Sequence, residues 1–180
     1  MSSTTATRNR SDARTTIITA CVIIGLTAFD LGRALFKGVI DTALSAAIPE
    51  GIHWSELNTG PAVCYGIGLT LKVLGIVGIC IFLIRAARPM LRGEIFTRSN
   101  ARNLSSASWC VVIWVVGQFA FELIGDNLAA HQFGIDWWYD QLHTSQLGLA
   151  LPLGFITCLT LFTVVIRRGI TLEEDVDGLV

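Results

Sequence analysis

Charged residues are scarce in this sequence, and their scarcity argues against an ordinary soluble domain. They account for 15% of the 180 residues, whereas soluble domains carry about 25%. Hydrophobic residues reach 52%, and the mean hydropathy is +0.60. A chain of this length builds one core rather than several. We therefore expect one membrane-embedded domain and no separate soluble domain.

The sequence also lacks the patterns that usually carry enzymatic chemistry. It contains no Cys-x-x-Cys pair, no phosphate-binding glycine loop and no evident internal repeat. Its cysteines lie within or beside apolar segments, which favours packing over metal ligation or disulfides: Cys21, Cys64, Cys80, Cys110 and Cys158. We therefore expect no catalytic site, no cofactor, no metal and no nucleic-acid partner.

Two residue pairs have the spacing of a weak metal-binding motif. His53-x-x-Glu56 and Asp140-x-x-His143 would each present two ligands on one side of a helix. A protein metal site needs further converging ligands, and none is evident near either pair. We therefore favour solvated loop residues over a metal site.

Four apolar segments are the clearest feature that the sequence does contain. They cover residues 16–36, 62–84, 106–125 and 147–166, close to the ~20 residues with which an α-helix crosses ~30 Å of hydrocarbon. They predict an all-α fold, a polytopic four-helix transmembrane bundle over residues 15–168. The flanking ends are expected to be a disordered cytoplasmic tail and an acidic cytoplasmic tail, over residues 1–14 and 169–180.

The basic residues indicate how the segments are oriented. Ten of the 13 Lys and Arg residues lie before the first segment, between the second and third, or after the fourth: Arg8, Arg10, Arg14, Arg85, Arg88, Arg92, Arg98, Arg102, Arg167 and Arg168. Short loops rich in Lys and Arg stay in the cytoplasm. We therefore expect both termini and the 85–107 loop inside, and the other two loops outside.

The first outer loop is expected to contain a short amphipathic helix. Val39, Ile40, Ala43, Leu44 and Ala47 recur at a spacing of three or four residues, which is typical of a helix lying on a membrane surface. Aromatic residues on the same side are interpreted as anchors in the headgroup layer rather than as a binding cage: Trp54, Tyr65 and those of residues 136–140.

Polar residues inside the segments are the strongest candidates for a site, because an intramembrane charge costs at least ~2.5 kcal/mol. Counting ~1.5 Å per residue from the cytoplasmic ends places Asp30, Lys72, Gln118 and Glu122 in one layer. Lys72 lies too deep to reach water easily and should pair with a carboxylate. Glu122 is the preferred partner, because Arg33 already offers Asp30 a local ion pair.

Two interpretations of this polar layer are open. It can be a proton or ion relay, or a pocket for a charged ligand. It can also be an interhelical contact that fixes how the helices pack. We favour the structural interpretation, because a relay usually needs more acidic residues near the middle of the membrane.

The 85–107 loop carries a motif that can order it. Gly93 permits a turn, Phe96 follows it, and Thr97 can cap a new helix that leads into the third segment. The arginines of this loop, Arg92 among them, can also contact anionic lipid headgroups.

The acidic tail from Thr171 to Val180 allows three interpretations. It can be a solvated end, which we favour, or a docking peptide for a cytoplasmic partner. It can also fold back onto the arginines of the 85–107 loop.

The stretches RGEIFTRSNARNL and RRGITLEEDVDGLV, together with the four-segment layout, resemble bacterial membrane proteins grouped as domain of unknown function 2975. The matching positions are Gly93, Phe96 and Thr97 in the loop, and Gly169, Leu172, Glu174 and Val180 in the tail. The layout covers most of the chain, whereas the motifs cover only these two stretches. The resemblance implies a multi-pass protein of the bacterial cytoplasmic (inner) membrane, and it implies no activity, because none is established for the family.

Small residues recur at spacings that let membrane helices approach closely: Cys21, Gly25, Ala28 and Gly32 in the first segment, Gly68 and Gly75 in the second, and Ala150 and Gly154 in the fourth. Such stripes let helices approach within the chain or between chains. Because catalytic residues are lacking, we expect an accessory or regulatory subunit that acts through helix packing and cytoplasmic motifs. Its expected partners are the lipid bilayer and either another membrane protein or a second copy. The alternative is a small transporter or an ion or proton relay that uses Lys72, Glu122 and Asp30.

Overall fold

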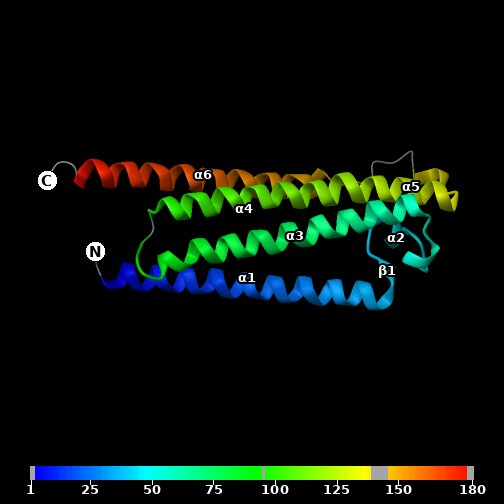
Figure 1. Ribbon diagram of the computed structural model, residues 1–180, viewed down its shortest axis with the longest axis horizontal. Coiled ribbons are helices and arrows are strands. Elements are labelled where there is room, and N and C mark those ends of the chain that lie inside the picture. The colour runs from blue at the N-terminus through cyan, green and yellow to red at the C-terminus, as the bar shows by residue number, and fades with distance from the viewer. Residues whose placement is uncertain (1–2, 95, 139–145, 178–180) are drawn as a thin grey trace. The chain divides into compact units, whose positions relative to one another are not determined.

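The computed structural model describes residues 3–94, 96–138 and 146–177 (Figure 1). Within them, four helices are long and apolar enough to cross a membrane: Arg10–Lys37, Thr59–Met90, Arg98–Phe133 and Gly148–Val176. Helices dominate the fold, as the apolar segments predict, and a single two-stranded ladder is the only sheet among the described residues.

The exposed surface of these helices is strongly apolar. Phe29 is 67% exposed, Phe36 95% and Leu151 71%. A soluble protein rarely presents contiguous apolar surface of this kind to water, whereas hydrocarbon tails are a good solvent for it. The four helices and their exposed apolar side chains identify a multi-pass membrane protein.

The long helices extend beyond the apolar segments. Helix α1 spans Ser3–Lys37, α3 spans Thr59–Met90 and α6 spans Gln146–Asp177. The third span is built from α4 (Arg98–Val116), the π-helical segment η2 (Gly117–Glu122) and α5 (Leu123–Phe133), and it ends where Gly134 adopts a left-handed φ of 67°. It therefore begins and ends outside the predicted range of 106–125.

The described parts of both tails are helical. Residues 3–14 belong to α1, so the structure differs from the expected disordered tail over 1–14, and residues 169–177 belong to α6. Threonine hydroxyls near both tails donate hydrogen bonds to the carbonyl group four residues earlier, in the preceding helical turn. Thr15 donates to the Ser11 carbonyl at 3.1 Å, and Thr171 donates to the Arg167 carbonyl at 3.2 Å. Low hydropathy ends a membrane-spanning segment, but it does not end a helix, because helical hydrogen bonds continue into polar sequence.

The chain folds into two compact units. Unit 1 comprises Met1–Gly25, Ile76–Val111 and Leu153–Val180, and unit 2 comprises Leu26–Gly75 and Val112–Pro152. In unit 1, α3 and α4 pack closely where Gly78 faces Cys110. A Cβ added to Gly78 would lie 2.6 Å from the Cys110 sulfur, so only a glycine lets the two helices approach this closely.

Unit 2 contains a compact connection between α1 and α3. Strand β1 (Val39–Ile40) pairs antiparallel with β2 (Ile52–His53), and α2 (Ala43–Ala47) lies between them in sequence. Thr42 caps α2 by accepting from the Ser45 amide at 3.2 Å. Figure 1 shows β1 and α2 near the beginning of α3.

This connection differs from the single surface helix expected over residues 39–47. Val39 and Ile40 are extended because they pair with β2, and Leu44 is fully buried in the core of unit 2. The other members of that core come from the two strands, from α3, and from α5 and the residues that follow it: Ile40, Ile52, Tyr65, Ala129, Ala130 and Trp138. The apolar spacing that predicts a helix is therefore satisfied partly by a strand.

A glutamine fixes this connection to α5. Gln132 accepts from the Asn58 amide at 2.8 Å and donates to the Glu56 carbonyl at 2.6 Å. The short helix η3 (Asp136–Trp138) follows α5 and buries Trp138, while Trp137 is 51% exposed. Burial of Trp138 and Tyr65 contradicts their expected role as headgroup anchors.

Candidate functional site: a polar cluster between α3 and the π-helical segment

In unit 2, two glycines bring α3 and η2 into backbone contact. A Cβ added to Gly117 would lie 2.9 Å from the Gly68 carbonyl oxygen and 3.1 Å from the backbone nitrogen of Lys72. A Cβ added to Gly68 would likewise lie 3.1 Å from the Gly117 carbonyl oxygen. This close approach holds the polar side chains of the two helices within reach of one another.

Glu122 is the centre of the polar cluster. The Lys72 ammonium donates to one oxygen of its carboxylate, and the Gln118 amide donates to the other at 2.7 Å. The Lys72 and Glu122 side chains are only 20% and 10% exposed. The structure thus pairs Lys72 with Glu122, in agreement with the preference for this carboxylate over Asp30.

The π-helical turn contains both Gln118 and Glu122. A π-helical turn holds one more residue than an α-helical turn, and such turns occur frequently at functional sites. This local geometry places the two side chains on one carboxylate-centred network facing α3. No simple sequence pattern predicts the wider turn.

A second buried pair joins α3 to α5, the helix that follows the π-helical segment. The Tyr65 hydroxyl donates to the Asp126 carboxylate at 2.7 Å, and both residues are 3% exposed. Gly125 makes room for the tyrosine ring, because a Cβ there would lie 2.8 Å from two ring carbons. The sequence alone does not predict this pair. Its only signal is spacing, since Tyr65 is seven residues from Lys72, and Asp126 is four from Glu122.

Together these residues form what we call the polar cluster: Tyr65, Lys72, Gln118, Glu122 and Asp126. Each of its five side chains takes part in at least one hydrogen bond within the cluster. Lys72 neutralises the charge of Glu122, which removes much of the cost of burying either group alone. The arrangement can fix the packing of two spans. It also places two carboxylates, Glu122 and Asp126, on the same span.

Asp30 does not take part in these contacts. It lies on α1 and is exposed, and neither ion pair of the described residues includes it. Of the four residues expected in one polar layer, only Lys72, Gln118 and Glu122 are in contact. Depth along each helix was sufficient to align three of the residues, but it does not determine which way a side chain on α1 faces.

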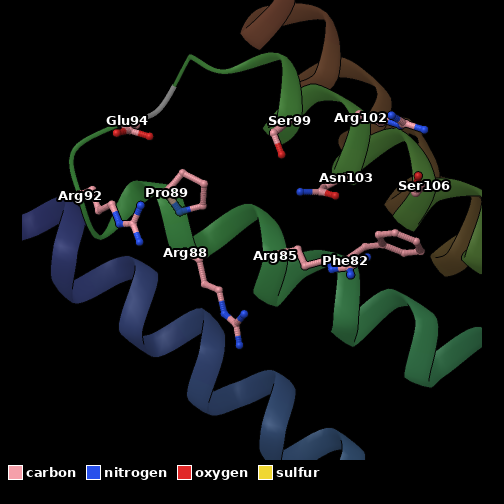
Figure 2. Close-up of a pocket in the computed structure, with 10 residues that line it drawn as sticks. All are labelled: Phe82, Arg85, Arg88, Pro89, Arg92, Glu94, Ser99, Arg102, Asn103 and Ser106. Atoms are coloured by element: carbon pink, nitrogen blue, oxygen red, sulfur yellow. The ribbon is translucent and has the colours of Figure 1, made fainter.

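The loop motif of unit 1 is ordered much as its sequence predicts. Gly93 has a φ of +88°, a left-handed conformation that favours glycine. Thr97 precedes α4, and its hydroxyl accepts from the Asn100 amide at 3.1 Å, as expected for a helix cap. Figure 2 shows Arg92 and Glu94 on the turn that follows Pro89.

Phe96 and Arg98 both contact the last turns of α6 in the same unit. A Cβ added to Gly169 would overlap the Phe96 ring, and Arg98 donates to Glu174 at 2.8 Å. Of these contacts only the Arg98–Glu174 ion pair belongs to the tail that begins at Thr171; it joins the tail to the arginine loop, while Glu174 stays exposed as the preferred interpretation of a solvated end expects. The tail is a continuation of α6 rather than a folded-back strand, and the ion pair is exposed to solvent.

The candidate metal pair of His53, at the end of β2, and Glu56, in the following 3-10 turn, has a local structural role. Glu56 accepts from the His53 backbone amide at 3.4 Å, which ties the end of β2 to the following turn. Among the described residues, no group of three or more His, Cys, Asp or Glu side chains could hold a metal ion. Asp140 and His143 lie outside the described residues.

Comparison of the chain with family models, with curated proteins and with solved structures gives no match.

Proposed function

We propose that this protein is a non-enzymatic accessory or regulatory subunit that packs its helices against a membrane partner. The observation that carries the proposal is an open small-residue face on α1. Cys21 is exposed, and a Cβ added at Gly25 or Gly32 would meet no atom of the described chain within 4 Å. Small residues let membrane helices approach closely, so this face suits a helix of another protein or of a second copy.

The polar cluster supports a structural role within the subunit. Glu122 uses its two oxygens for Lys72 and Gln118, and Tyr65 uses its hydroxyl for Asp126. These bonds join α3 to the third span at two levels. Two spans joined in this way suit a subunit whose role is to pack against a partner.

The proposed topology places both termini and the 85–107 loop in the cytoplasm. The distribution of Lys and Arg supports it. Reporter fusions at Arg98 and after Val180 should report the cytoplasm, and fusions at Trp54 and Trp137 should report the outside. An active extracytoplasmic reporter after Val180 would contradict four spans with both ends inside.

The proposed location is the bacterial cytoplasmic membrane. Its support is the resemblance of the Gly93–Phe96–Thr97 motif and of the acidic tail to the proteins of domain of unknown function 2975. We propose membership of that family on the same residues.

The alternative function is an ion or proton relay through the polar cluster. The π-helical turn around Glu122 and the second buried carboxylate, Asp126, favour it. Purified protein in liposomes containing a pH-sensitive dye would test this alternative. Proton flux above that of empty liposomes, abolished by Glu122→Gln, would favour the relay over the accessory subunit.

Affinity purification of the full chain in mild detergent, followed by mass spectrometry, tests the accessory function. A stoichiometric membrane partner or a stable oligomer is expected, and Gly32→Leu should reduce its recovery. The matched control is Gly66→Leu on α3, since Gly66 also has no described atom within 4 Å of an added Cβ. A lone monomer, or equal loss with both variants, would contradict the proposal.

A further inference from the structure

An open, strongly basic hollow lies between the end of α3 and the beginning of α4 in unit 1. Its volume is about 600 Å³, and we call it the arginine pocket. Four arginines and one glutamate line it: Arg85, Arg88, Arg92, Arg102 and Glu94. Arg85 and Arg88 are three residues apart near the end of α3, which brings them to one side of that helix, and Arg92 follows on the turn after Met90.

Neutral hydrogen-bond donors complete the lining. Ser99, Asn103 and Ser106 line the pocket from α4, again at a spacing that places them on one helix face. Figure 2 shows Ser99 and Asn103 directed from α4 toward α3. Guanidinium groups combined with hydroxyl and amide donors are the chemistry that binds phosphate oxygens.

The positive charge of the pocket is not balanced by the protein groups that line it. Neither ion pair of the described chain involves Arg85, Arg88, Arg92 or Arg102. Arg102 also lines an adjoining hollow of about 230 Å³, together with Arg98 and Arg167. The four arginines that line the hollow are exposed, and an anion bound there would offset part of their positive charge.

The position of the pocket along the spans identifies the anion. One span ends at Met90 and the next begins at Arg98, so the hollow lies where two spans leave the hydrocarbon. Phe82 adds an apolar surface to the lining, and an acyl-glycerol backbone can pack there. Basic pockets at this level of a membrane bind lipid headgroups.

We propose that the arginine pocket binds the phosphate of an anionic phospholipid. The guanidinium groups of Arg85 and Arg92 contact the phosphate oxygens, and Ser99 and Asn103 donate the neutral hydrogen bonds. The adjoining hollow, which shares Arg102, accepts a second phosphate when the lipid carries two. The site is independent of the proposed accessory function, because it uses neither α1's small-residue face nor the polar cluster.

Native mass spectrometry and thermal unfolding of the full chain in mild detergent test this site. The probes are phosphatidylglycerol, a diphosphatidyl lipid, zwitterionic phosphatidylcholine and inorganic phosphate at equal phosphate concentrations. The two anionic lipids are expected to remain bound in the spectrometer and to raise the unfolding temperature. Phosphatidylcholine and inorganic phosphate are expected to do neither.

A charge-matched pair of variants locates the binding. Arg85→Gln with Arg92→Gln should weaken phosphatidylglycerol binding by about tenfold or more, because two charge-assisted hydrogen bonds are lost. Arg10→Gln with Arg168→Gln removes the same charge from residues that line neither hollow, and it should bind as the unmodified protein does.

Three outcomes would overturn the proposal. Equal binding by the two double variants would show that the pocket is not the site. Equal stabilisation by phosphatidylcholine would show that the anionic phosphate is not recognised. Saturation by inorganic phosphate, with no further effect of lipid, would assign the pocket to a soluble phosphate instead of a lipid.

Discussion

Glu122 holds Lys72 with one carboxylate oxygen while its other oxygen accepts from Gln118. The lysine lies on α3 and the glutamate on the π-helical turn of the third span. Both side chains are largely withdrawn from solvent, so each charge depends on the other for its stability. This dependence makes the pair accessible to a double-mutant cycle.

We predict strong coupling between these two residues. Lys72→Met or Glu122→Gln alone should lower the free energy of unfolding by an amount near the lower end of the ~3–5 kcal/mol typical of a broken buried pair. The double variant should recover much of that loss, because no uncompensated charge is left. Thermal unfolding of the detergent-solubilised variants measures the coupling.

Asp30→Asn is the control for this cycle, because Asp30 is exposed and stands outside the cluster. It should change the unfolding temperature little and should not rescue Lys72→Met. Additive losses at Lys72 and Glu122, or rescue by Asp30→Asn, would contradict the pairing.

A second prediction concerns the backbone contact beneath the ion pair. Gly117→Ala should destabilise the protein by ~1–3 kcal/mol, since the new methyl group would lie 2.9 Å from the Gly68 carbonyl oxygen and the Leu71 Cβ. The backbone atoms of α3 at Gly68 and Lys72 leave the new methyl group little room. The unfolding temperature of the purified variant measures this cost.

Gly66→Ala is its matched control on α3, since an added Cβ there meets no described atom within 4 Å. It should be neutral, or stabilising by up to ~1 kcal/mol, as expected for alanine in place of a helical glycine. An equal effect of the two substitutions would mean that helix propensity, rather than close packing, determines the result.

The sequence predicted the four long helices because each contains an apolar run of membrane-spanning length. It did not predict where the helices end. Ser3 and Asp177 lie well outside the apolar runs, and helix ends in polar sequence depend on local hydrogen bonds that hydropathy does not report. The Thr97 cap was predictable, because a cap is a short-range feature of the chain.

The polar cluster was predictable only in part. Depth along the helices aligned Lys72 with Glu122, and a spacing of four aligned Gln118. The sequence favours a headgroup anchor at Tyr65. Its burial depends on the space that Gly125 leaves on another span, which the sequence around Tyr65 does not report. Such complementarity between distant residues is a tertiary property and leaves no periodic signal.

A third prediction tests the contact between the inner loop and α6. Gly169→Ala should displace the Phe96 ring, since an added Cβ would overlap it. Displacement should expose the loop, so protease cleavage between Arg92 and Arg102 should increase in inverted vesicles. Phe96→Ser should have the same effect, and combining the two substitutions should add little, because both remove one contact.

Gly154→Ala is the control for this experiment, on the same helix but with no described atom within 4 Å of the added Cβ. It should leave the cleavage rate unchanged. Unchanged cleavage in Gly169→Ala, or fully additive effects with Phe96→Ser, would show that something other than this contact orders the loop.

The last prediction concerns the exposed ion pair between Arg98 and Glu174. Their side chains are 85% and 58% exposed, and exposed pairs contribute at most about 1 kcal/mol. Such a pair is screened strongly at a Debye length of ~3 Å in 1 M salt. Hydrogen exchange of the α6 amides around Glu174 should therefore become faster as salt is raised, and in Glu174→Gln the exchange of these amides should be fast already at low salt.

Asp175→Gln on the neighbouring position removes the same charge without touching Arg98, and it should keep the salt dependence. If exchange around residue 174 is independent of salt in the unmodified protein, the end of α6 is held by its own helical hydrogen bonds and by the Phe96 contact, and the ion pair contributes nothing measurable.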